Sequence, residues 1–181
     1  TATSEAEATQ RHSGTWGDGY RRTALLYICD NYARLEGLSL RSSSYAFSTF
    51  GLAAGGGEVH ISHCFSHCTG NTTIYPFDSG TSEAFTYKLW NNIGITDSTN
   101  ATSHAFNVND ADITAYIYNN TGIANTGNAF NGSAGTVYLK NNIGYSASGA
   151  SFSGTFSSVD YCASDDATAD EQLGGERCRA G

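Results

Sequence analysis

Four residues that favour helices, Met, Lys, Glu and Leu, are scarce in this chain, and so are positively charged residues. Methionine is absent, proline occurs once (Pro76), and charged residues make up only 14% of the sequence. Because Met, Lys, Glu and Leu are favourable helix residues, this scarcity argues against a mainly helical protein. The 21 glycines, with abundant Ser, Thr and Asn, indicate short strands joined by tight turns. The aromatic share of 12% is too high for a disordered linker.

The deficit of basic residues gives the chain a formal net charge of −8 and a pI near 4.9. Nucleic-acid binding needs a basic surface that displaces phosphate counterions, so this charge argues against a nucleic-acid partner. It also disfavours anionic membranes, and no segment approaches the roughly 18 apolar residues of a membrane span. We therefore expect neither nucleic-acid binding nor membrane insertion.

The length of 181 residues suits one domain. The five cysteines are odd in number and too few to hold a fold of this size together by disulfides. Some fit as small buried apolar groups. They leave the redox compartment open.

What the chain does contain is an internal repeat. A short alternating strand followed by Asn-Asn-x-Gly occurs in Lys88–Gly94, Tyr116–Gly122 and Tyr138–Gly144. The asparagine pairs are 28 and then 22 residues apart. Each pair is followed by a second marker, which ends in a phenylalanine. These phenylalanines, 24 and 22 residues apart, are Phe106, Phe130 and Phe152.

Weaker copies extend the repeat in both directions. Val59–Cys64, Leu26–Asn31 and Val159–Cys162 take the phase of the strand, while Tyr45–Phe47 and Glu83–Phe85 supply earlier copies of the second marker. A period near 22 with alternating strands and turns is typical of a solenoid. The sequence therefore predicts an all-β fold, a right-handed single-stranded parallel β-helix of about six coils. A β-sandwich and a leucine-rich solenoid are the alternatives, but the first needs no periodic Asn-Asn-x-Gly and the second lacks its signature.

Alternation within the first strand of each coil predicts which side chains point inward. These pairs are Leu26/Ile28, Val59/Ile61, Tyr87/Leu89, Ala115/Ile117, Val137/Leu139 and Val159/Tyr161. The asparagines after the strand would stack from coil to coil and hydrogen-bond through their amides. This ladder would contain Asn31, Asn92, Asn120 and Asn142, with Cys64 interrupting it.

The repeat divides the chain into three parts. Residues 1–23 form a lead-in, residues 24–164 the parallel β-helix, and residues 165–181 a terminal cap or acidic tail. Ser4 and Glu7 have the spacing of a capping box, so residues 4–11 fit a short capping helix or equally a frayed polar tail.

The strand and Asn-Asn-x-Gly coils of residues 24–164 resemble the right-handed parallel β-helix (pectate-lyase-like) superfamily. Gly14–Arg21, Asn31–Leu38 and Tyr161–Asp170 more narrowly resemble β-helix virion and tail proteins of uncultured marine phages. The resemblance implies polysaccharide lyases, hydrolases, phage tailspikes or non-catalytic structural and adhesive modules. It also implies an extracellular or virion-surface location and, by analogy with tailspikes, a homo-oligomer such as a trimer. Fold alone does not choose among these functions.

No complete catalytic set is present. Pectate lyases carry a strand motif that ends in Ile-Asp-His, and here Ser62 stands at the position of the Asp that helps hold Ca²⁺. The motif series of polygalacturonases is missing, and Asp165-Asp166 alone does not supply the facing carboxylates of glycoside hydrolysis. The sequence therefore favours a protein without catalytic activity. If it is an enzyme, it would be a lyase or hydrolase whose best available groups are His60, His63, Asp30 and Lys88.

Two clusters have ligand types that metals accept. Five nitrogen and sulfur ligands that suit Zn²⁺ lie within nine residues, namely His60, His63, Cys64, His67 and Cys68. In the inferred phase His60 points outward and Cys64 inward, which argues against a tetrahedral site. Asn107, Asn109, Asp110 and Asp112 offer oxygens for Ca²⁺ but lack the Gly and distal Glu of a calcium loop. Ordinary core and turn roles explain both clusters better, so no cofactor is implied.

The outward positions of the first strand are the most informative. Neighbouring coils would form an aromatic stripe of Trp90, Tyr116, Tyr118 and Tyr138, flanked by Lys88 and Lys140. Exposed aromatic surfaces commonly contact a partner, and flat rings suit sugar faces. Cross-strand stacking that merely stabilises the sheet explains the stripe equally well. An ice- or surface-binding solenoid would need a flat array of threonines in place of these rings. We therefore expect a non-catalytic module for structure or adhesion, with a glycan surface as its partner.

Overall fold

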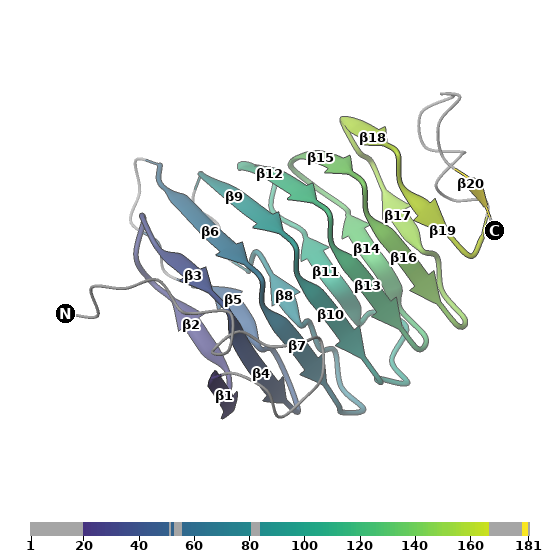
Figure 1. Cartoon of the computed structure of the whole chain (residues 1–181), viewed down its shortest axis with the longest axis horizontal. Coiled ribbons are helices and arrows are strands. Elements are labelled where there is room, and N and C mark those ends of the chain that lie inside the picture. Colours follow the sequence, from purple (N-terminus) through teal and green to yellow (C-terminus); the bar gives the residue numbers. More distant parts are fainter. Residues whose placement is uncertain (1–19, 51, 53–55, 81–83, 167–178, 181) are drawn as a thin grey trace.

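A computed structural model describes residues 20–50, 52, 56–80, 84–166 and 179–180, and all regular structure within them is β-strand (Figure 1). The strands form three parallel sheets. Sheet A contains, in spatial order, β1 (Tyr20–Thr23), β4 (Leu38–Ser42), β7 (Phe65–Cys68), β10 (Ile93–Thr96), β13 (Thr121–Ala124), β16 (Ile143–Ser146), β19 (Ala163–Ser164) and β20 (Arg179–Ala180). Sheet B contains β17 (Phe152–Gly154), β14 (Asn128–Gly132), β11 (His104–Val108), β8 (Phe77–Asp78), β5 (Phe47–Thr49) and β2 (Leu26–Ile28). Sheet C contains β18 (Ser158–Asp160), β15 (Thr136–Lys140), β12 (Ile113–Tyr118), β9 (Phe85–Trp90), β6 (Glu58–Ser62) and β3 (Arg34–Glu36).

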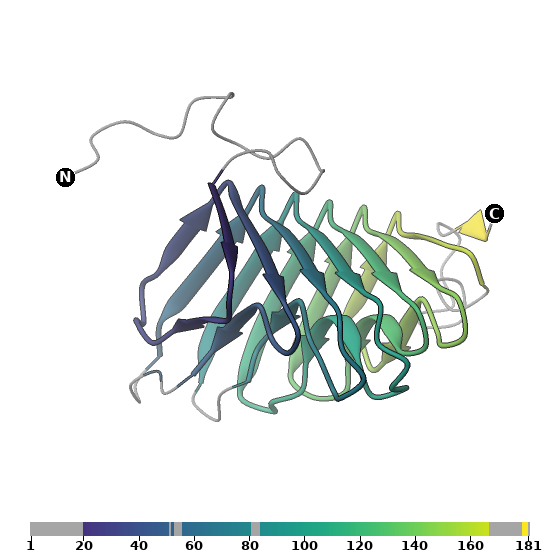
Figure 2. The same cartoon turned by 90° about the horizontal axis from the view of Figure 1, so that it is seen from below.

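The chain visits sheets B, C and A in the same order on every turn, so the fold is a parallel β-solenoid, as the repeat predicts. Figure 2 shows successive turns side by side along the long axis. Four turns, β5–β7, β8–β10, β11–β13 and β14–β16, have a neighbouring turn on both sides in all three sheets. The structure thus has about four inner turns in place of the six equivalent coils that the sequence predicts, and the sets β2–β4 and β17–β19 flank them.

The inner face of sheet C follows the predicted alternation. Parallel registers align Leu35, Ile61, Leu89, Ile117, Leu139 and Val159 in one column. Val59, Tyr87, Ala115 and Val137 form the next column, and all four are fully buried. The predicted phase of Leu26–Asn31 is wrong, because β2 pairs with β5 in sheet B and β3 takes the place in sheet C.

Five phenylalanines form a continuous stack on the inner face of sheet B, in the core. Their register partners follow one another from turn to turn: Phe47, Phe77, Phe106, Phe130 and Phe152. Adjacent ring centroids lie 4.8 to 5.0 Å apart, and the rings are nearly parallel. The prediction that Phe85 carries the second marker is therefore wrong, because Phe85 opens β9 in sheet C and Phe77 occupies this position in the stack.

An asparagine ladder runs along the corner between sheets C and A. Asn92 Nδ2 donates to Asn120 Oδ1 at 3.1 Å, and Asn120 Nδ2 donates to Asn142 Oδ1 at 3.2 Å. Cysteines occupy both ends, because the Cys64 N–H donates to Asn92 Oδ1 and Asn142 Nδ2 reaches the sulfur of Cys162. The predicted member Asn31 is not in the ladder; its amide donates to the carbonyl oxygen of Gly56. The reason is again the phase of β2.

The residue before each ladder position has a left-handed backbone. The five φ values lie between 51° and 57°, at His63, Asn91, Asn119, Asn141 and Tyr161. Asn adopts this conformation more readily than most residues, which explains the Asn-Asn pair: the first residue makes the corner and the second fills the ladder. Tyr161 takes the corner position, so its predicted inward orientation is wrong, and its side chain is 51% exposed.

The chain ends are only partly described. The residues expected to form a capping helix, 4–11, lie outside the described residues. Tyr20–Thr23 pairs with β4, and Arg179–Ala180 pairs with β19, so both ends add a strand to sheet A.

Candidate functional site

The outer face of sheet C carries the residues of the predicted aromatic stripe. Alternation turns every second side chain of each strand outward, and the parallel registers align these side chains in columns. One column contains His60, Lys88, Tyr116 and Tyr138; the next contains Ser62, Trp90, Tyr118, Lys140 and Asp160. A third contains Glu58, Thr86, Thr114 and Thr136. The four stripe residues therefore lie on one wall, on three adjacent strands.

A groove of about 640 Å³ is hollowed into this face. Its lining residues are Glu58, Thr86, Lys88, Trp90, Tyr116 and Tyr118. Tyr116 stacks on Tyr138 with ring centroids 5.1 Å apart and an angle of 10°, while Tyr118 meets Tyr116 edge-on at 6.1 Å. Because each ring is braced by another, the groove presents a largely fixed aromatic wall.

Charged groups gather at the end of the groove nearest β6. Glu58 forms an ion pair with Lys88 through one carboxylate oxygen and a hydrogen bond with His60 through the other. The hydrogen bond from Lys88, helped by His60, holds the pKa of Glu58 below its usual value. His60 also meets Trp90 edge-on at 5.1 Å. The aromatic wall therefore adjoins a contiguous set of a carboxylate, an imidazole and an ammonium group.

Two of the four catalytic candidates are thus brought together. His60 and Lys88 share Glu58, a residue that the sequence reasoning missed. Its position two residues before His60 was the available signal, because residues i and i+2 share a face of a strand. Asp30 lies elsewhere, where its Oδ1 accepts the N–H of Tyr32 at 3.2 Å in a turn.

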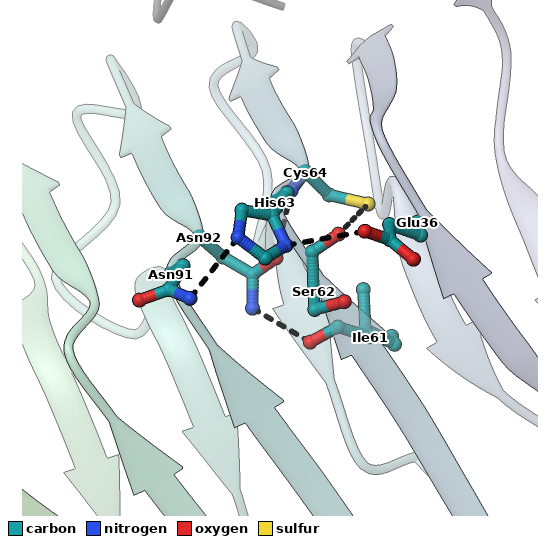
Figure 3. Close-up of polar contacts among 7 residues, drawn as sticks. All are labelled: Glu36, Ile61, Ser62, His63, Cys64, Asn91 and Asn92. Carbon is teal, nitrogen blue, oxygen red and sulfur yellow. Dashed lines mark hydrogen bonds and ion pairs between the residues drawn. The ribbon is translucent and has the colours of Figure 1, made fainter. Parts of the chain in front are cut away.

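His63, the fourth candidate, occupies the corner shown in Figure 3. Its Nε2 lies 3.2 Å from Asn91 Nδ2, and its Nδ1 lies 3.6 Å from Glu36 Oε1. Figure 3 also shows Cys64 in the adjoining ladder position, with its sulfur directed to the carbonyl oxygen of Ser62. His63 therefore bridges neighbouring turns at the corner, away from the lining of the groove.

The candidate zinc ligands point in different directions. Cys64 and Cys68 are fully buried, and burial raises the pKa of each thiol to about 12, so neither is a ready thiolate ligand. His60 lies on sheet C, and His67 lies on sheet A with Asp97 Oδ2 at 2.6 Å. Within the described part of the chain, no three His, Cys, Asp or Glu side chains are grouped so that they could hold a metal ion.

The candidate calcium loop has a structural role in the residues described. Asp110 Oδ1 accepts the N–H of Asp112 at 3.1 Å, which closes a turn before β12. The N–H of Asn109 donates to Ser79 Oγ on the preceding turn of the solenoid. Asn107 stands in sheet B and donates to Asp78 Oδ1.

None of the residues that the structure describes belongs to a helix long and apolar enough to cross a membrane. No family model matches the chain, and no curated protein or solved structure matches it significantly. What the structure shows is a parallel β-solenoid fold, and the comparisons support no family and no similarity to phage proteins.

Proposed function

We propose that the protein is a non-catalytic module for adhesion, which binds a glycan chain in the aromatic groove of sheet C. The observation that carries this proposal is the groove itself: Trp90, Tyr116 and Tyr118 line a concave surface together with polar groups. Aromatic rings offer flat apolar faces to the C–H faces of sugars, and polar neighbours can bind hydroxyl groups. The sequence resemblance to phage β-helix proteins adds an extracellular or virion surface as the proposed setting.

The charges around the groove favour a neutral glycan over a strongly acidic one. Lys88 is held by Glu58, and Lys140 stands opposite Asp160 in the parallel register. Neither lysine is therefore an isolated positive charge on this face. Adjacent strands are roughly 4.8 Å apart, so the rings of β9, β12 and β15 span roughly 10 Å. Such a span suits a short segment of a polysaccharide.

Alanine variants of two groove residues test this proposal. Purified wild type, Trp90→Ala and Tyr116→Ala would be titrated with dextran, cello-oligosaccharides, alginate and polygalacturonate in a calorimeter. We expect wild type to bind a neutral member of the panel and each variant to bind it about tenfold more weakly, because a stacking ring is lost. Tyr145→Ala is the matched control, since Tyr145 is a 47% exposed tyrosine on sheet A. Equal losses in the control and the groove variants would contradict the proposal.

A second candidate function, polysaccharide lyase, is favoured by the Glu58, His60 and Lys88 cluster. Proton abstraction next to a sugar carboxylate needs a positioned base, and imidazole and amine groups both serve this purpose. The assay is release of unsaturated products from polygalacturonate and alginate, followed by ultraviolet absorbance with and without Ca²⁺. Product formation that disappears in His60→Ala or Lys88→Ala but persists in His67→Ala would establish this function in place of simple binding.

The proposal extends to a homo-oligomer, with a trimer as the form that the tailspike resemblance suggests. Light scattering coupled to size-exclusion chromatography measures the mass directly. A mass three times that of the 19.1 kDa chain would support the trimer, and a mass equal to one chain at all concentrations would refute it.

A further inference from the structure

A second hollow lies on the outer face of sheet B, on a different wall of the solenoid from the groove. It has a volume of about 290 Å³, and the residues that matter here are Tyr27, Tyr45, Phe50, Tyr75 and Asp78. Tyr27 belongs to β2 and Asp78 to β8, while the others lie just outside the strands β5 and β8. Residues separated by up to 51 positions in the chain (27 to 78) are thus brought together by stacked turns.

Asp78 is the buried charged group of this hollow. Asp78 is only 3% exposed. Asp78 Oδ2 accepts a hydrogen bond from Ser48 Oγ at 3.1 Å, Oδ1 accepts one from Asn107 Nδ2 at 2.8 Å, and the Gly80 N–H also donates. All three donors are neutral. No Lys, Arg or His among the described residues forms an ion pair with Asp78, so its charge is hydrogen-bonded but not balanced by a cation.

Four aromatic rings line the same hollow as this carboxylate. Tyr45 and Tyr75 meet edge-on with ring centroids 5.3 Å apart, and Tyr27 and Phe50 meet at the same distance in a tilted arrangement. Tyr27 and Phe50 are more than half exposed, which is unusual for large aromatic side chains that contact each other. Burial and the negative charge of Asp78 together raise the pKa of Tyr75 to about 12, so its hydroxyl is neutral at physiological pH.

We propose that this hollow, the Asp78 pocket, binds a small organic cation through a methylated ammonium group. Cations are attracted to the faces of aromatic rings, and several rings around an acidic group form a cage for quaternary ammonium ions. The buried carboxylate supplies the balancing charge. The Asp78 pocket lies apart from the groove on sheet C, and the proposal does not depend on glycan binding there.

The hydrogen bonds of Asp78 select this class of cation over others. A primary ammonium group carries three N–H donors that need acceptors, but three of the roughly four acceptor sites of the carboxylate are already occupied. A metal ion needs several oxygen ligands, and Asp78 is the sole carboxylate among the described residues that line the pocket. A fully methylated, quaternary ammonium group has no N–H to satisfy and interacts through charge and ring contact alone.

The same arrangement makes binding depend on pH. Burial raises the pKa of Asp78 to about 6, so the carboxylate loses its charge below this pH and attraction for a cation falls. Three other titratable groups described at the pocket, those of Tyr45, Tyr75 and His104, do not change charge near pH 6. Burial raises the pKa values of Tyr45 and Tyr75, and it lowers the pKa of His104, which stacks on Tyr75, to about 4.

Titration of the full chain with choline, followed by calorimetry or NMR, tests the proposal. The neutral carbon isostere of choline, 3,3-dimethylbutan-1-ol, serves as the matched probe because it has the same shape without the charge. We expect choline to bind above pH about 6 and to bind about tenfold more weakly below it. We expect the isostere to bind at least about tenfold more weakly than choline. Equal binding of both probes, or binding of neither, would overturn the proposal.

Variants separate the carboxylate from a general effect of charge. Asp78→Asn should weaken choline binding at least about tenfold, while Asp97→Asn, which removes the same charge from the sheet A side, should leave it unchanged. Phe50→Leu removes an exposed ring without opening the core and should weaken binding several-fold, so the test stands even if Asp78→Asn does not fold.

Sedimentation with phosphatidylcholine vesicles distinguishes the source of the cation. Binding to both vesicles and choline indicates a lipid headgroup, and binding to choline alone indicates a free cation. Unchanged affinity in both pocket variants would refute the assignment.

Discussion

The side-chain amide of Asn92 donates to Oδ1 of Asn120 at 3.1 Å, although 28 residues separate them in the chain. The same oxygen accepts the backbone N–H of Asn92 at 2.9 Å. Asn120 in turn repeats this pattern with Asn142. A ladder of this kind fixes how adjacent turns are aligned with each other. If one turn shifted along its strands relative to the next, several buried polar groups would lose their hydrogen-bond partners.

Asn120→Ala should therefore destabilise the protein strongly. The substitution removes the acceptor of the Asn92 N–H and one donor to the Leu89 carbonyl, in a site that is 1% exposed. Each buried unsatisfied group costs about 1–3 kcal/mol, so we expect a loss of about 3 kcal/mol in the free energy of unfolding, measured by urea denaturation. Asn119→Gly is the control: this exposed residue has φ of 55°, which Gly adopts freely. A similar loss in both variants would show that the ladder does not have this role.

Gly122→Ala should also destabilise, for a steric reason. The φ angle of Gly122 is not in the left-handed region, but an added Cβ would lie 2.9 Å from Phe130 Cε2 and 3.0 Å from the carbonyl oxygen of Ala129. Overpacking of this kind costs about 1–3 kcal/mol. The double variant Gly122→Ala/Phe130→Leu measures the coupling by denaturation. We expect Gly122→Ala to cost less when it is combined with Phe130→Leu than when it is made alone, and additive effects would contradict the steric explanation.

The repeat was readable from the sequence because Asn-Asn-x-Gly carries three separate constraints. Its first Asn makes the left-handed corner, its second Asn fills the ladder, and its Gly makes room for the phenylalanine stack. All three constraints coincide around Asn92, Asn120 and Asn142, so the turns there could be predicted correctly from the sequence. The same repeat correctly predicted that the stripe residues lie on one sheet.

The first turns were harder to assign, because alternation with period two is the same on every wall of a solenoid. Leu26–Asn31 alternates and ends in Asp-Asn, which is the pattern of a strand of sheet C. Its strand β2 nevertheless pairs with β5 in sheet B. Phe85 likewise imitated the second marker because it follows an alanine. The repeat could not predict the Asp78 pocket, since Phe50 and Tyr75 lie outside the strands and outside every copy of the repeat.

Stability should depend on pH through Asp78. Burial raises the pKa of its carboxyl from 3.8 to about 6 in the folded protein, so between these values the folded state binds more protons than the unfolded state. The contribution of Asp78 to the free energy of unfolding therefore falls as the pH rises from about 4 to about 6, and it is constant above that. Two pKa units correspond to about 3 kcal/mol as an order of magnitude. Asp78→Asn lacks this slope, so urea denaturation of both proteins across this range should show wild type losing stability relative to the variant. Parallel curves would contradict the raised pKa.

Cys64→Asn should be tolerated, although it places an amide at a fully buried position. Cys64 occupies the ladder position next to Asn92, its thiol donates to the carbonyl oxygen of Ser62, and the backbone N–H groups of Gly37 and Leu38 lie close to its sulfur. An asparagine there would offer its oxygen to the same N–H groups and its amide to Asn92 Oδ1, which extends the ladder by one turn. We expect the free energy of unfolding to change by less than about 1 kcal/mol. Cys68→Asn is the control, because Cys68 is equally buried but stands outside the ladder; there an unsatisfied amide should cost about 2–3 kcal/mol. Urea denaturation measures the free energy of unfolding of both variants. Equal losses in the two would contradict the expectation that an amide at position 64 is stabilised by joining the ladder.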